Sequence, residues 1–192
     1  ANNYSLIGFY SKNPKGYGRI VSQNSKISVV EEKNANKSIK KINLCYSGVF
    51  CGPKQEIFKA LNEIKKNKNT NEYLFTDIFK FLNNENLPIK ILTFPEEELM
   101  GVNNKIQLAY ANRILQNRIK LMHMKNGVTF LSPDSVYIHI SAKIGKDVVI
   151  EPNVFLGNDV VIKSNVLIKS NSHIEDTEIN SFCEIGPTCR IR

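Results

Sequence analysis

The chain has 192 residues, 42% of them hydrophobic, and a formal net charge of +8, which suits one ordinary domain or two small ones rather than a disordered chain. No apolar run approaches the roughly 18 residues of a membrane-spanning helix, and the first residues lack the pattern of a signal peptide, so we expect no membrane partner. The lysines are scattered among Asn, Glu and Ser, so we expect no nucleic-acid groove, although a basic surface suits phosphorylated ligands.

The first part of the chain, up to about Val128, mixes strand and helix patterns. Short runs rich in β-branched and aromatic residues predict strands. The five predicted strands cover residues 5–10, 19–21, 27–31, 42–50 and 89–94.

Two short helices are predicted between these strands. Pro53 stands where a first helical residue belongs, before an apolar face that contains Ile57 and Leu61. Thr76 is predicted to be the N-cap of the second helix, which carries Ile78, Phe79 and Leu82.

The longest predicted helix covers residues 105–123. Asn104, with Gln107 three residues later, predicts a capping box at its start. The apolar stripe of this helix is predicted to consist of Ile106, Leu108, Ala109, Ile114, Leu115 and Leu121.

After Val128 the sequence repeats every six residues. Successive blocks open with Ile or Leu at positions 144, 150, 156, 162, 168 and 174; one block is then a residue short, and the register resumes at Ile185. The fourth residue is often Asn or Asp, which tolerates left-handed backbone geometry at turns, and the fifth is often Val. This period predicts a left-handed parallel β-helix with the opening aliphatics stacked inside. The alternative, a β-sandwich of short strands, does not require a constant period of six.

The four cysteines form no C-x-x-C pair, and the three histidines are not spaced for a zinc site with them. We therefore expect reduced thiols in a cytoplasmic protein.

Five short stretches, in this order and followed by the hexapeptide blocks, resemble one family. The stretches are 16–21, 31–35, 72–77, 101–104 and 185–192. The family is the bifunctional UDP-N-acetylglucosamine pyrophosphorylase / glucosamine-1-phosphate N-acetyltransferase (GlmU family), and the chain resembles its middle portion. The implied fold is α/β followed by all-β: the C-terminal part of a Rossmann-like nucleotidyltransferase domain (1–103), a linker helix (104–127) and the first coils of an acetyltransferase β-helix (128–192).

The resemblance implies four substrate-binding residues. Gly18 would lie against the nucleotide-sugar, although a tight turn also explains it. Glu31 would bind the sugar, although a solvated charge at a strand end is the alternative. Asn103 would help to hold Mg2+, although Asn is also a favoured residue before a helix. Arg192 would bind a sugar phosphate, unless it is simply an exposed charge.

Tyr46 departs from the family pattern, in which an Asn precedes Ser-Gly and contacts the nucleotide-sugar. A tyrosine cannot reproduce the paired donor and acceptor of an amide. The family's triphosphate loop would precede Gly16 and its catalytic histidine would follow Arg192, so neither His139 nor His173 is predicted to be catalytic.

The resemblance implies a portion of an enzyme with two reactions. One transfers a uridylyl group from UTP to N-acetylglucosamine-1-phosphate, and the other transfers acetyl from acetyl-CoA to glucosamine-1-phosphate; UDP-N-acetylglucosamine results, and the β-helix would form a homotrimer. Two alternatives stay open: a non-catalytic remnant or trimeric assembly module, and a regulatory subunit that binds the sugar nucleotide without turnover.

Overall fold

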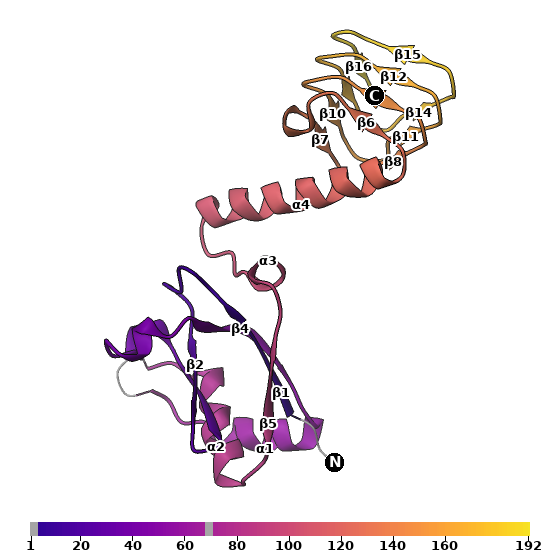
Figure 1. Cartoon of the computed structure of the whole chain (residues 1–192). Helices are drawn as coiled ribbons and strands as arrows, with labels where there is room; N and C mark the ends of the chain where they lie inside the picture. The colour runs from indigo at the N-terminus through magenta and orange to yellow at the C-terminus, as the bar shows by residue number, and fades with distance from the viewer. Residues whose placement is uncertain (1–3, 68–70) are drawn as a thin grey trace. The chain divides into compact units, whose positions relative to one another are not determined.

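The computed structural model describes residues 4–67 and 71–192. The chain divides into two compact units, Ala1–Val102 and Asn103–Arg192, the first α/β and the second dominated by short parallel strands (Figure 1). The predicted fold class, α/β followed by a parallel β-helix, is therefore confirmed. In the described ranges no helix is long and apolar enough to cross a membrane.

The first unit is built on a five-stranded mixed sheet. All five predicted strands are present, with ends that shift by one or two residues: β1 (Tyr4–Tyr10), β2 (Arg19–Gln23), β3 (Lys26–Val30), β4 (Leu44–Cys51) and β5 (Ile89–Thr93). Their order is β3-β2-β4-β1-β5, in which only the β1–β5 pair is parallel.

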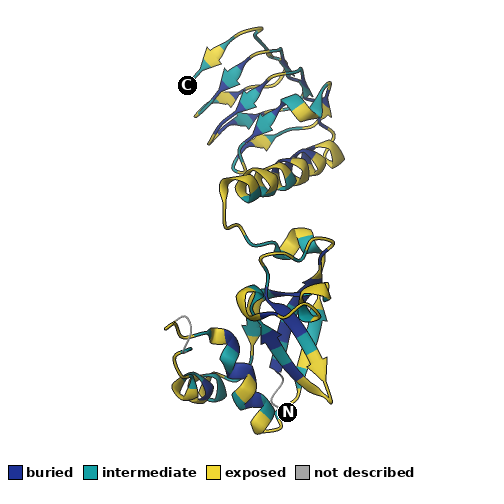
Figure 2. Cartoon of the chain, turned by 90° about the vertical axis from the view of Figure 1, so that its left-hand side faces the viewer, coloured by how far each residue is buried: buried dark blue, intermediate teal, exposed yellow. Residues whose placement is uncertain are grey.

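In the described residues of this unit, three α-helices accompany the sheet: α1 (Lys54–Glu63), α2 (Ile78–Asn84) and α3 (Glu96–Leu99). The side chains of Ile78, Phe79 and Leu82 are fully buried and pack with Leu6 and Ala60 in one core cluster. Figure 2 shows this buried interior in dark blue, beneath helices with exposed outer faces.

The predicted N-cap at Thr76 is wrong. A 3-10 turn at Phe75–Asp77 precedes α2, Asp77 takes the N-cap position, and no side chain caps the helix. Thr76 is buried at 7% exposure inside the turn, so packing rather than capping determines its place. Two further 3-10 turns in this unit cover Glu32–Asn34 and Ile39–Lys41.

The second unit begins with the long helix α4 (Lys105–Lys125), and its predicted capping residues are confirmed. The Asn104 side chain accepts a hydrogen bond from the Gln107 N–H at 2.9 Å. The Gln107 side chain in turn accepts from the N–H of Asn103 at 2.7 Å, one residue before the position that a standard capping box uses.

The predicted apolar stripe of α4 does not face the core. Ile106 and Leu108 are 83% and 49% exposed, whereas the buried residues of the helix are Gln116, Ile119, Lys120 and His123. The physical reason is that the first coil offers α4 unpaired backbone groups as well as apolar surface, so polar side chains occupy the contact.

The remaining chain coils into a three-sided prism, which confirms the predicted parallel β-helix. Its faces are the parallel sheets β16-β13-β10-β7, β14-β11-β8 and β15-β12-β9-β6. A 3-10 turn at Pro133–Ser135 lies between the first two strands. The strands are β6 (Thr129–Phe130), β7 (Tyr137–Ile138), β8 (Lys143–Ile144), β9 (Val149–Ile150), β10 (Phe155–Leu156), β11 (Val161–Ile162), β12 (Leu167–Ile168), β13 (His173–Ile174), β14 (Glu178–Ile179), β15 (Glu184–Ile185) and β16 (Arg190–Ile191).

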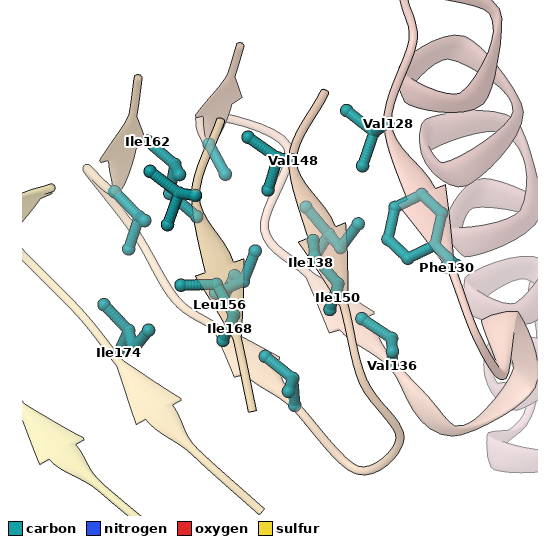
Figure 3. Close-up of a cluster of buried hydrophobic side chains, with 14 of the residues drawn as sticks. Val128, Phe130, Val136, Ile138, Val148, Ile150, Leu156, Ile162, Ile168 and Ile174 are labelled. Atoms are coloured by element: carbon teal, nitrogen blue, oxygen red, sulfur yellow. The ribbon is translucent and has the colours of Figure 1, made fainter. Parts of the chain in front are cut away.

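The stacked aliphatics of the hexapeptide blocks fill the prism (Figure 3). Ile150, Leu156, Ile168 and Ile174 are fully buried, and the Val residues at the fifth positions are at most 2% exposed. The fourth positions adopt the left-handed conformation that the Asn and Asp pattern predicts, with φ between 51° and 60° at Asp147, Asn153, Asp159, Asn165 and Asn171.

Candidate functional site

The candidate sugar site of the first unit joins two of the predicted residues, Gly18 and Glu31. A Cβ atom placed on Gly18 would lie 3.5 Å from Glu31 Oε2 and 3.1 Å from Val29 Cγ1. Gly18 is itself buried, and a larger residue there would crowd Val29, so the backbone at the start of β2 lies directly beside the carboxylate that follows β3. Glu31 is partly exposed, so its carboxylate is accessible for a hydrogen bond to a ligand hydroxyl.

Tyr46 borders the same place. Its backbone N–H donates to the carbonyl oxygen of Gly18 at 2.8 Å, which pins β4 against the end of β2. Its ring is 8% exposed and packs edge-on against Phe79, with centroids 6.0 Å apart, and its hydroxyl has no hydrogen-bond partner among the described residues. Burial, with a smaller contribution from the charge of Glu31, raises the pKa of Tyr46 to about 12. Tyr46 is therefore a neutral, buried donor beside the candidate site.

An ion pair between a buried arginine and a partly exposed carboxylate supports the loop that carries Glu31. Arg19 is 1% exposed; its Nη2 lies 2.8 Å from Glu32 Oε2, and its Nη1 donates to the Tyr17 carbonyl oxygen. Burial alone would raise the pKa of Glu32, but the hydrogen bond and charge of Arg19 outweigh it and hold this pKa below its usual value. The neighbouring Cys45 is fully buried, and burial raises the pKa of its thiol to about 11, which makes it unreactive at neutral pH.

The ion pair predicts a pH dependence of stability. Because the folded-state pKa of Glu32 is lowered, its stabilising contribution is fully present above the unfolded-state pKa of about 4.3 and is lost as pH falls through the lower folded-state value. We expect the protection factors of the β2 amides against hydrogen exchange to fall over this acidic window, and Glu32→Gln to flatten the response. An unchanged acid response in Glu32→Gln would show that other carboxyl groups cause it.

Asn103 and Arg192 lie in the second unit and share no contact partner there. Asn103 is exposed just before α4, and its backbone N–H belongs to the helix cap. A single amide oxygen is compatible with Mg2+ only where phosphates and water supply most of the ligands. No group of three or more His, Cys, Asp or Glu side chains in the described parts of the chain is placed to hold a metal ion. Mg2+ at Asn103 stays a prediction.

Arg192 lies in a column of side chains on the β-helix surface. Its Nε is 3.5 Å from Glu175 Oε2, and the other carboxylate oxygen of Glu175 is 3.2 Å from His173 Nε2. The Glu175 side chain lies over Gly157, where an added Cβ would come within 2.5 Å of Glu175 Cγ. Glu175 thus holds the guanidinium group of Arg192 from the coil below.

Sequence reasoning missed both Glu175 and the Arg19–Glu32 pair. A signal for Glu175 was present, because Gly157 and Glu175 are 18 residues apart, which is three blocks of six and therefore one full coil. For Arg19 no such signal exists, since a single Arg in a strand predicts an exposed side chain.

Comparisons with known proteins agree with this architecture. Residues 132–191 match a family model described as the GMPPB C-terminal domain. The chain is 40% identical over 185 residues to the bifunctional protein GlmU of Clostridium beijerinckii, which covers 96% of this chain and 41% of the relative. The corresponding proteins of Bartonella bacilliformis and Lactobacillus helveticus are each 37% identical and cover 97% and 94% of this chain. The chain spans about two fifths of the length of these relatives.

Proposed function

We propose that this chain, which is similar over nearly its whole length to a portion of the bifunctional protein GlmU, serves the synthesis of UDP-N-acetylglucosamine for cell-envelope precursors. Its first unit would contribute part of a uridylyltransferase site and its second unit the opening coils of an acetyltransferase. We further propose a cytoplasmic homotrimer that assembles through the β-helix.

The observation that supports the first activity best is the contact between Gly18 and Glu31. The backbone of Gly18 and the partly exposed carboxylate of Glu31 lie side by side at the end of the β2–β3 pair, where a sugar hydroxyl could donate to the carboxylate. In this proposal Gly18 and Glu31 bind and orient the sugar. Mg2+, when bound with help from Asn103, would neutralise phosphate charge.

For the second activity, Arg192 would bind the phosphate of glucosamine-1-phosphate. A guanidinium group held from one side by Glu175 keeps donors free on its other side, and Arg192 is 63% exposed in its side chain. Acetyl-CoA would be the co-substrate of that reaction.

A second candidate function is a sugar-nucleotide-binding or trimeric assembly module without turnover, and Tyr46 favours it. The Tyr46 ring packs against Phe79 and its backbone is fixed to Gly18, so the tyrosine cannot move aside without disturbing the core. Binding measured together with turnover separates the two candidates: both are expected of the enzyme, and binding alone of the module.

We expect UDP-N-acetylglucosamine to bind the full chain, and Glu31→Gln to weaken this binding roughly tenfold to a hundredfold. The reason is that a charge-assisted hydrogen bond contributes about 1.5–3 kcal/mol. Isothermal titration calorimetry measures the change. The matched control is Glu85→Gln, which alters an exposed carboxylate after α2 and should leave the affinity unchanged. Equal affinities of the Glu31→Gln variant and the unaltered chain would remove Glu31 from the proposed site.

A further inference from the structure

The face of α4 that meets the β-helix carries more polar side chains than a packing surface needs. Two hydrogen bonds explain why Gln116 is buried: its side-chain amide donates to the Ile138 carbonyl oxygen at 2.8 Å and accepts from the Ile138 N–H at 3.0 Å. It replaces the strand partner that the first coil lacks on this side. Lys120, one turn further along, has no comparable structural explanation.

Lys120 is a buried cation with too few partners. It is 5% exposed, and its Nζ donates to the Pro133 carbonyl oxygen at 2.6 Å, the one acceptor that the described residues provide for three N–H bonds. Burial lowers the pKa of Lys120, and the charge of Asp134 only partly opposes this. An ammonium group removed from water is costly unless further acceptors or an anion compensate it.

A pocket of about 460 Å³ is lined by Lys120 and other residues of α4 and by the segment 134–137. Its helical wall is formed by Arg113, Asn117 and Lys120, whose spacings of four and three residues place them on one side of α4. Asp134 and Tyr137, from the segment that follows the first strand of the β-helix, also line the pocket.

The charge of the surroundings favours an anion. Helix α4 contains five Lys or Arg residues and no Asp or Glu, so the potential along it is positive. The charged residues that line the pocket are Arg113, Lys120 and Asp134, so the formal net charge of its lining is +1. Such a pocket suits one oxyanion group of a small molecule better than a di- or triphosphate, which Asp134 would repel.

We propose that the pocket formed by Arg113, Asn117, Lys120, Asp134 and Tyr137 binds a small molecule through a single phosphate or carboxylate group. Lys120 supplies the buried charge, Asn117 an amide donor, and Arg113 a second cation, whose guanidinium carbon lies 5.1 Å from the centre of the Tyr110 ring. This site is separate from Arg192 and does not depend on the proposed enzymatic activity.

The test uses the full chain and two probes, inorganic phosphate and acetate, added at constant ionic strength. We expect saturable shifts of the backbone amide resonances of residues 134–137 with at least one probe. Lys120→Met, which replaces the cation by an apolar chain of similar length, should weaken binding by about tenfold or more, because it removes a charged hydrogen bond. The control Lys125→Met removes an exposed lysine of the same helix and should leave binding unchanged.

Arg113→Gln, at an exposed position, provides a second variant should Lys120→Met disturb the fold; it should weaken binding in the same direction. The proposal is overturned if neither probe shifts these amides saturably, or if the lysine and arginine variants bind like the unaltered chain. Equal weakening by Lys125→Met would also overturn it, because the effect would then reflect the general charge of α4 rather than the pocket.

Discussion

Replacing Glu32 by alanine is expected to lower the free energy of unfolding of the first unit by about 1–3 kcal/mol. The variant leaves the guanidinium group of Arg19 at 1% exposure without its carboxylate, and an uncompensated buried charge is far more costly than a lost surface ion pair. A loss of this size is a large fraction of the roughly 5–15 kcal/mol that stabilises a typical domain. Hydrogen exchange of β2 and β4 amides reports it for this unit alone.

Two variants separate the buried charge from the loss of the Glu32 side chain itself. The double variant Arg19→Met and Glu32→Leu removes the charge together with its partner and should recover much of the stability, since apolar replacements of buried ion pairs are often neutral. Glu85→Ala, at an exposed carboxylate, should change it by less than about 0.5 kcal/mol. If Glu32→Ala were as mild as Glu85→Ala, water would be reaching Arg19 and its guanidinium group would not be buried in solution.

The β-helix could be predicted from the sequence because each structural requirement recurs in every coil. An inward aliphatic, a left-handed turn residue and a small corner residue return every six positions, so a single exception such as Phe182, which has φ of 64° where Asn or Asp is usual, does not obscure the pattern. The strands of the first unit were equally predictable from β-branched residues such as Val29, which is buried while the residues on either side of it are only partly buried.

The buried face of α4 could not be predicted by the same reasoning. Hydrophobic periodicity assumes that a helix packs its apolar side chains on the core, but α4 covers a coil whose backbone needs hydrogen bonds, and Gln116 meets that need. Periodicity therefore selected Ile106 and Leu108, which are exposed. The burial of Lys120 and the pocket that it lines were not predicted either, because a lysine in a helix is expected to be exposed to solvent.

The candidate sugar site was predictable only through the family resemblance. Gly18 and Glu31 lie at the two ends of the β2–β3 hairpin. Their proximity follows only from the antiparallel register, in which Arg19 is opposite Val30, and the local sequence does not predict that register. The bulk of Tyr46 was apparent from the sequence, but its packing against Phe79 depends on where α2 crosses the sheet.

Leu156→Ala is expected to destabilise the β-helix by about 2–5 kcal/mol. Leu156 is fully buried in β10, between Ile138 of β7 below and Ile174 of β13 above, and each of these residues is paired with it in register. Strands of two residues contribute few hydrogen bonds each, so the stacked aliphatics carry most of the cohesion between coils. A cavity at this level cannot be closed by a shift of one strand, because all three faces of a coil are covalently continuous.

The damage should spread to the neighbouring coils rather than stay at β10, since each coil of such a repeat is stabilised by its neighbours. Hydrogen exchange should therefore accelerate at Tyr137 and His173 as well as at Phe155, while the first unit keeps its protection. Ile140→Ala is the matched control: Ile140 is 66% exposed, and its truncation should change stability by less than about 0.5 kcal/mol. Faster exchange confined to Phe155 would mean that the coils open independently and that the aliphatic column does not couple them.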